Sequence, residues 1–129
     1  MANSVGYHES EGKLRPETQD NHRALTSMQE ELEAADWYDQ RVDAASDPGL
    51  KEILAHNRDE EKEHFAMLLE WYRRRDAKMD AHLKEYLFST GSLVAREQAA
   101  TGDSGAGADG GGSGSGSLGI GSLKGGQGL

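Results

Sequence analysis

The sequence predicts an all-α protein, made of an antiparallel two-helix hairpin, a short third helix and a disordered C-terminal tail. Three observations predict this fold class. Helix-forming residues fill two long stretches on either side of a single Pro-Gly break. The aromatic residues all precede Thr101, whereas 13 of the 17 glycines follow it. The foldable part is therefore about the first hundred of 129 residues, a length whose thin core often requires oligomerisation.

Composition excludes several classes of protein. The chain has 23 acidic and 14 basic side chains and a net charge of −9, which argues against a nucleic-acid partner. It has no cysteine, which excludes disulfide scaffolds, thiol nucleophiles and thiolate metal sites. No apolar run approaches the ~20 residues of a membrane span, and the N-terminus lacks the apolar core of a secretory signal. We expect a cytoplasmic protein without a membrane partner.

The first elements follow from polarity and helix propensity. Residues 1–15 are polar and aperiodic, so we expect a flexible N-terminal segment. We expect one helical domain over residues 16–98. Its first helix starts at Pro16, which suits a first helical turn because that turn does not use the missing N–H, and continues to about Ala45.

A break at Ser46-Asp47-Pro48-Gly49 separates the first helix from the second. Ser46 or Asp47 can cap the new helix and Pro48 fits its first turn, so the second helix is predicted from Pro48 to Arg74 or Arg75. Two long helices joined by a tight turn make an antiparallel hairpin. A third helix is predicted over residues 79–98, weakened midway by Gly91.

The end of the chain combines a linker with an unexpected apolar motif. Residues 99–116 are rich in Gly and Ser and predict a flexible linker. Within residues 117–129, Leu118, Ile120 and Leu123 interrupt this glycine-rich composition. They are typical of an extended peptide that docks in a groove on another protein, although a frayed tail with incidental leucines is the simpler alternative.

The second helix carries a candidate metal-binding pair. Its apolar stripe consists of Ile53, Leu54, Phe65, Met67, Leu68, Trp71 and Tyr72. Glu61 and His64 fall in the middle of this stripe, at the E-x-x-H spacing of helix-borne di-iron carboxylate sites. A carboxylate on an apolar face needs a cationic partner, which can be a metal or, in the alternative interpretation, His64 itself in a structural ion pair.

Helix geometry adds Glu31 to this pair. With the turn centred near Asp47, Glu31 lies 16 residues before it, and Glu61 and His64 lie 14 and 17 residues after it. At 1.5 Å per residue the three residues should lie at nearly the same height in the hairpin. A complete di-iron bundle needs two single glutamates and two E-x-x-H motifs, and the chain has one of each. Two chains related by a two-fold axis would therefore complete both a four-helix bundle and the iron site.

Other polar and aromatic residues near Glu31 have two interpretations each. Glu30 and Glu33 form either a solvated acidic face or a secondary cation site that feeds iron to the centre. Trp37 and Tyr38 are expected to pack in the core. The alternative is a place at the seam between two chains, with Tyr38 near the metals. The remaining histidines have no ligand spacing and are expected at surfaces or interfaces; they are His8, His22, His56 and His82.

Three segments carry a resemblance to a known family: QEELEAADWY at 29–38, RDEEKEH at 58–64 and LGIGSLK at 118–124. Together they resemble the encapsulated ferritins, the half-length ferritin-like cargo proteins of encapsulin nanocompartments. The resemblance implies an open ring of ten subunits built from five dimers, inside an encapsulin shell to which residues 117–129 dock.

The resemblance also implies an activity and assigns roles to residues. It implies a ferroxidase that oxidises Fe²⁺ with O₂, with Glu31, Glu61 and His64 as the ligands of a di-iron site that two subunits share. Glu30 and Glu33 would match an acidic site through which iron is taken up, with Trp37 beside it. The iron mineral would be stored in the shell rather than in the open ring.

Other functions fit the sequence less well. A non-catalytic helical cargo adaptor, with Glu61 and His64 as a structural pair, is the alternative function. A hemerythrin-like oxygen carrier needs more helix-borne histidines than the chain aligns. A rubrerythrin-type peroxidase is disfavoured because cysteine and a second E-x-x-H motif are both lacking.

Overall fold

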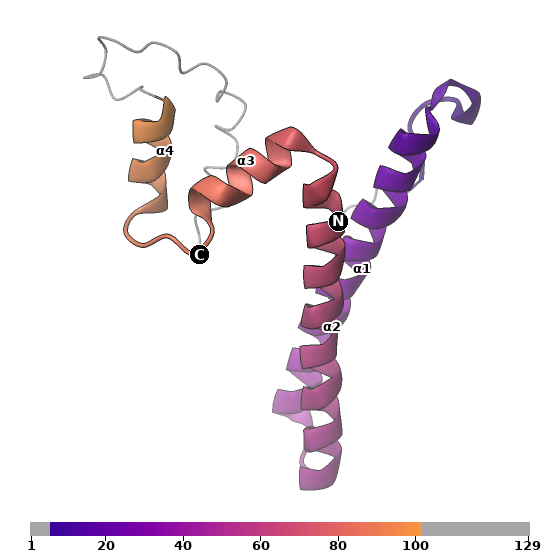
Figure 1. Cartoon of the computed structure of the whole chain (residues 1–129). Coiled ribbons are helices and arrows are strands. Elements are labelled where there is room, and N and C mark those ends of the chain that lie inside the picture. The colour runs from indigo at the N-terminus through magenta and orange to yellow at the C-terminus, as the bar shows by residue number, and fades with distance from the viewer. Residues whose placement is uncertain (1–5, 102–129) are drawn as a thin grey trace. The chain divides into compact units, whose positions relative to one another are not determined.

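The computed structural model describes residues 6–101, and these residues are helical without a β-strand among them (Figure 1). A short 3₁₀ helix, Glu11–Lys13, precedes four α-helices. Their bounds are α1, Pro16–Ala44; α2, Pro48–Arg74; α3, Ala77–Tyr86; and α4, Leu93–Thr101. The predicted all-α class is confirmed. The predicted docking peptide, residues 117–129, and the linker beyond Thr101 lie outside the described residues.

α1 and α2 form the predicted antiparallel hairpin, and the break between them lies where the sequence places it. Pro16 and Pro48 each occupy the first turn of a helix. The Asp47 carboxylate caps α2 by accepting a hydrogen bond from the backbone N–H of Leu50 at 2.8 Å. Lys51 stabilises the turn from the other side, since its Nζ donates to the carbonyl oxygens of Val42 and Ala45 at the end of α1.

The two helices bury little of their apolar surface against each other. Ala24 and Met28 are the only buried hydrophobic side chains in the described part of the chain. Leu32, Ile53 and Met67 are more than half exposed, although the sequence pattern assigns all three to apolar stripes. A single hairpin thus leaves a large apolar area in water, which a second copy could cover.

An ion pair fixes the register of the hairpin near its turn. Arg58 on α2 donates to Asp39 on α1 at 2.9 Å and to its neighbour Asp59 at 3.0 Å. Side-chain hydrogen bonds to Asp59 and Asp39 raise the pKa of Arg58.

Among the described residues, no helix is both long and apolar enough to cross a lipid bilayer.

The N-terminal segment contacts α1 over its described part. The rings of Tyr7 and His22 lie 4.9 Å apart between centroids. The side-chain amide of Gln19 donates to the carbonyl oxygens of Glu11 and Leu14. The stretch predicted as a flexible segment therefore has specific contacts with its own chain from residue 6 onwards.

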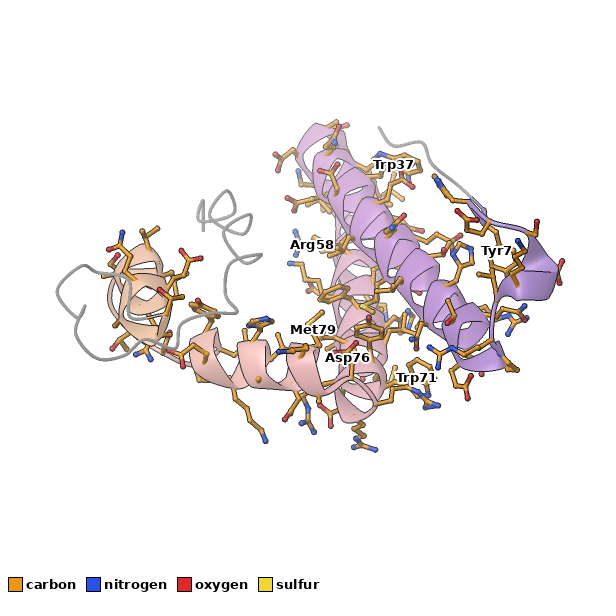
Figure 2. All side chains as sticks on the ribbon, turned by 90° about the horizontal axis from the view of Figure 1, so that it is seen from above. Tyr7, Trp37, Arg58, Trp71, Asp76 and Met79 are labelled. Atoms are coloured by element: carbon orange, nitrogen blue, oxygen red, sulfur yellow. The ribbon has the colours of Figure 1, made fainter. Side chains whose placement is uncertain are left out.

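Charged side chains join α2 to the start of α3. Arg73 forms ion pairs with Glu70 and with Asp80, and Arg74 also pairs with Glu70 at 2.7 Å. Asp76 caps α3, accepting from the backbone N–H of Met79 at 2.7 Å (Figure 2). Hydrogen bonds from Arg73 and Arg74 lower the pKa of Glu70 to about 2.

This cluster predicts an acid-sensitive contribution to stability. The pKa of Glu70 is lower in the folded chain than its ordinary value of 4.5, so its ionised form stabilises the fold above pH 4.5 and this contribution is lost as the pH falls towards 2. We expect Glu70→Gln to lower the melting temperature above pH 4.5, with the difference from wild type closing at lower pH. Thermal melts followed by circular dichroism measure it, with the exposed Glu63→Gln as control. A difference that did not change with pH would contradict the prediction.

The predicted third helix over residues 79–98 is wrong in one respect, because two helices, α3 and α4, occupy that stretch. The backbone takes a left-handed conformation at Phe88, with φ 60°, and at Gly91, with φ 88°. Either conformation ends a right-handed helix. The hydroxyl of Ser92 then caps α4 by accepting from the N–H of Ala95 at 3.0 Å, and Arg96 pairs with Glu85 at 3.2 Å.

Candidate metal centre

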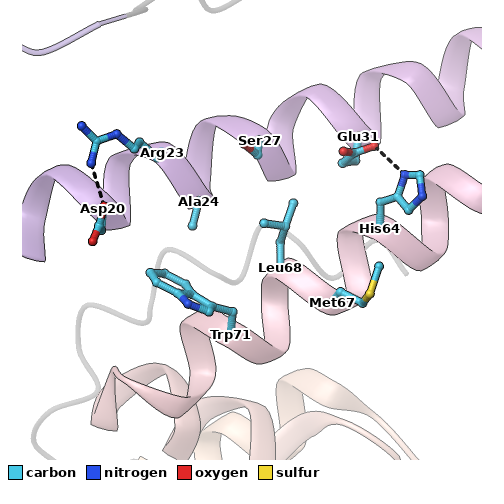
Figure 3. A pocket seen from close by; sticks show the side chains of 9 residues that line it. All are labelled: Asp20, Arg23, Ala24, Ser27, Glu31, His64, Met67, Leu68 and Trp71. Carbon is cyan, nitrogen blue, oxygen red and sulfur yellow. Dashed lines mark hydrogen bonds and ion pairs between the residues drawn. The ribbon is translucent and has the colours of Figure 1, made fainter.

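The structure brings together the three residues that the sequence predicts as metal ligands. Glu31 on α1 faces Glu61 and His64 on α2, and one ligand atom of each lies within 4.8 Å of the others. His64 Nδ1 is 3.5 Å from Glu31 Oε1 (Figure 3). The same nitrogen is 3.4 Å from Glu61 Oε1. It is the only group of this kind among residues 6–101. Glu31 and Glu61 meet because they lie at similar distances from the turn, 16 and 14 residues from Asp47.

These three side chains are only partly covered. Glu31 and Glu61 keep about a quarter of their side-chain surface exposed, 24% and 22%, and His64 keeps 42%. Glu31 and His64 border an open groove of about 640 Å³. The other residues that line the groove are Asp20, Arg23, Ala24, Ser27, Met67, Leu68 and Trp71 (Figure 3). The centre therefore lies on a face of the hairpin that a second chain can reach.

The three groups perturb one another electrostatically. Hydrogen bonding with Glu61, with burial as the next cause, raises the pKa of the Glu31 carboxyl, because two adjacent carboxylates without a cation compete for a proton. For His64, desolvation lowers the pKa, but the charges and hydrogen bonds of Glu31 and Glu61 outweigh it, and its pKa is raised. Metal ligation requires deprotonated carboxylates and a neutral imidazole, so a metal ion and protons compete for these groups.

The donor set suits a first-row transition metal. Two carboxylates and one imidazole fit iron, zinc and manganese alike. Three side chains are too few to hold two metal ions, since helix-borne di-iron sites use four carboxylates and two imidazoles. The group in one chain is half of such a set.

The structure adds a residue that the sequence reasoning did not assign to the site. Glu60 Oε1 lies 4.0 Å from His64 Nε2, the ring nitrogen that faces away from Glu31 and Glu61, and Glu60 Oε2 lies 3.3 Å from His56 Nε2. The signal in the sequence is the i, i+4 spacing of His56, Glu60 and His64. A carboxylate on the second nitrogen is how ligand histidines are commonly oriented.

The other candidate residues lie outside the group of three. Glu30 and Glu33 are exposed on α1. Trp37 is 49% exposed and borders a separate groove of about 450 Å³ with Gln40, Arg41 and Ala44. Tyr38 is half-buried, and the guanidinium of Arg41 lies 5.4 Å from the centre of its ring. Among residues 6–101, no hydrogen bond or ion pair joins these four residues to the group of three.

A helical hairpin with two carboxylates and an imidazole on one face has half of the helices and half of the ligands of a ferritin-like di-iron bundle. The chain belongs to the EncFtn-like family, whose sequence model matches residues 6–90. The resemblance inferred from the sequence is therefore confirmed.

Named relatives and a solved structure agree with this assignment. The chain is 58% identical over 122 residues to an encapsulated ferritin-like protein of Rhodospirillum rubrum, covering 92% of this chain and 87% of that protein. It is 46% identical to a ferritin-like protein of Thermotoga maritima, over 76% of this chain and 86% of the relative. A crystal structure of a Nitrosomonas europaea protein, 59% identical, superposes with a TM-score of 0.66 over 68% of this chain and 97% of the other.

Proposed function

We propose that the protein is a ferroxidase that oxidises Fe²⁺ to Fe³⁺ at a di-iron site shared by two copies of the chain. The meeting of Glu31, Glu61 and His64 from facing helices carries the proposal. Membership of a ferritin-like family supports iron as the metal, which the donor set alone does not select.

Two copies are needed for two reasons. Three ligands per chain supply half of a di-iron set. The hairpin leaves apolar side chains exposed, including Met67 at 58% beside the groove and Leu32 at 51% on α1. An isologous pair brings the two half-sets together on its two-fold axis and covers this apolar face in the same step. Such a pair is a four-helix bundle.

In the reaction, iron is the substrate and the side chains bind and hold it. Two Fe²⁺ ions held close together each give up one electron, and O₂ accepts them. Glu31 and Glu61 bind iron as carboxylates, and their negative charge stabilises Fe³⁺ relative to Fe²⁺. His64 binds through Nδ1, the nitrogen that faces both carboxylates. Glu60 Oε1 lies 4.0 Å from the other nitrogen, where its charge favours the imidazolium form without a hydrogen bond to the ring.

The remaining candidate residues have proposed roles outside this centre. Glu30 and Glu33, exposed on α1, form a secondary cation site that concentrates Fe²⁺ by their negative field. Trp37 and Tyr38 pack near the seam between chains.

The mineral is proposed to be stored in a surrounding shell. The R. rubrum relative is described as encapsulated, and a Myxococcus xanthus protein 34% identical over 84 residues is an encapsulin nanocompartment cargo protein. We assign docking on the inner wall of an encapsulin shell to residues 117–129, through Leu118, Ile120 and Leu123. The chain would then work in the cytoplasm, inside that compartment, as a ring of five dimers.

Aerobic oxidation of Fe²⁺, followed by Fe³⁺ absorbance, tests the activity. We expect the purified chain to accelerate oxidation well above a protein-free control. A well-folded oligomer without acceleration would favour the adaptor function, in which Glu61 and His64 form a structural pair.

A further inference from the structure

Among residues 6–101, one ion pair other than that of Glu31 with His64 joins α1 to α2. Arg58, labelled in Figure 2, lies on α2 and donates to Asp39 on α1 at 2.9 Å. Its Nε also donates to its neighbour Asp59 at 3.0 Å, which holds the guanidinium from its own helix. The Arg58 side chain is only 23% exposed, so this planar group is fixed between carboxylates of two helices.

The bond lies at the flank of the metal-centre face. With 3.6 residues in each helical turn, Asp39 lies about 80° around α1 from Glu31. Arg58 lies about 60° around α2 from Glu61 by the same count. Both partners belong to one chain. The bond therefore forms within each chain and does not require an uncovered metal-centre face.

The distance of the metal centre from the turn makes its geometry sensitive to the angle between the helices. Glu31 lies 16 residues from Asp47 at the turn, about 24 Å along α1. An opening of about 5° at the turn would move Glu31 about 2 Å away from α2, whereas functional groups must be held within about 0.5 Å. Asp39 lies halfway along this stretch, so a bond between the helices at Asp39 limits such an opening.

Packing holds the helices on the other side of the centre. Ala24 and Met28, which are 6% and 7% exposed, both precede Glu31 on α1. Within the described chain, α1 buries no side chain after Met28 and α2 buries none. Glu31 thus lies between a packed segment and the segment that is joined to α2 by the bond from Arg58 to Asp39.

We propose that Arg58 is a positioning residue for the metal centre. Its bond to Asp39 holds α1 and α2 at the separation at which Glu31 meets the two ligands of α2. Arg58 acts through the helices and not on the metal. Its effect on iron oxidation rests on the proposed ferroxidase function, whereas its effect on metal binding does not require oxidation.

A matched pair of variants tests the proposal in the full-length protein. Asp39→Ala and Asp59→Ala each remove one negative charge beside Arg58, but only Asp39→Ala removes the bond between the helices. Co²⁺ is the probe, titrated without oxygen and followed by its visible absorption. Because loss of residues that support a ligand lowers metal affinity 10–100-fold, we expect the half-saturating Co²⁺ concentration to rise about tenfold in Asp39→Ala. In Asp59→Ala we expect a rise of less than about twofold.

Two substitutions of Arg58 distinguish positioning from a general effect on the fold. Arg58→Met should weaken Co²⁺ binding as Asp39→Ala does. Arg58→Lys should restore part of the affinity, because an ammonium group can reach Asp39 but lacks the fork that pairs with two carboxylates. At saturation, the Co²⁺ spectrum of Asp39→Ala should differ from that of wild type. Helical circular dichroism and the native mass of the metal-free protein should not change.

Equal Co²⁺ affinity in Asp39→Ala and Asp59→Ala would overturn the inference. A weaker affinity in Asp39→Ala that appears only together with lost helicity would also overturn it, as would the absence of any recovery in a well-folded Arg58→Lys. Fe²⁺ oxidation by the same samples keeps the two proposals apart. The expected order of Co²⁺ affinities in a protein that does not accelerate Fe²⁺ oxidation would support the positioning role and overturn the ferroxidase.

Discussion

Glu61→Ala and His64→Ala each lower the rate of aerobic Fe²⁺ oxidation to that of protein-free buffer, the largest effect that we expect of any substitution. Both residues offer a ligand atom within 4.8 Å of the other ligands. Because the proposed site lies on a two-fold axis, one substitution removes two of its six ligands. Substitution of residues that only support a ligand lowers metal affinity or activity 10–100-fold. Substitution of a ligand itself should therefore lower the oxidation rate more than about 100-fold. Stopped-flow or steady-state Fe³⁺ absorbance measures the rate.

Matched variants separate this effect from loss of the fold. Glu63→Ala removes an exposed carboxylate from the same helix, between the two ligands, and should keep a rate close to wild type. Glu61→Gln preserves side-chain shape and tests the charge alone. Each variant is compared by helical circular dichroism. Substantial oxidation by a well-folded His64→Ala would contradict the role of the E-x-x-H motif as a ligand pair.

Removal of residues 117–129 should abolish capture by a co-expressed encapsulin shell and leave iron oxidation intact. Burial of one Leu or Ile side chain stabilises a complex by roughly 1.5–3 kcal/mol. Loss of Leu118, Ile120 and Leu123 together should therefore cost roughly 5 kcal/mol, more than about a thousandfold in affinity. Co-purification with the shell, read on a native gel, measures capture.

Point substitutions in the full-length chain provide the control for truncation. Alanine at Leu118, Ile120 and Leu123 should reproduce the loss of capture, whereas Lys124→Ala should reduce it less. Shell capture that survives these substitutions would contradict the docking role. Loss of ferroxidase activity with the tail would contradict the separation of the two functions.

The hairpin and its candidate site could be predicted because local signals dominate there. Pro16 and the Asp47-Pro48 pair mark helix starts through backbone chemistry that depends little on tertiary context. Once the turn is placed, the height of a residue in each helix follows from the rise per residue. Glu31 and Glu61 then have to meet.

The later elements could not be predicted in the same way. The division between α3 and α4 depends on a left-handed backbone at Phe88, a conformation that a bulky aromatic residue rarely adopts. Gly91 predicted a weak point within one helix. The break between α3 and α4 begins earlier, because Phe88 also has a left-handed backbone. The contact of Glu60 with His64 depends on side-chain rotamers, which spacing does not determine. The apolar stripes were expected to be buried, but Leu32, Ile53 and Met67 are more than half exposed in the single chain.

Native mass spectrometry during a stepwise Fe²⁺ titration tests the shared site most directly. Three ligands per chain on an uncovered face predict binding that saturates near one iron per chain, together with a shift to a larger, even-numbered oligomer. In Glu31→Ala, neither saturation near one iron per chain nor the shift to a larger oligomer should occur. A monomer that binds and oxidises two irons by itself, or an oligomer whose mass and metal content are the same in Glu31→Ala, would contradict a di-iron site built from two chains.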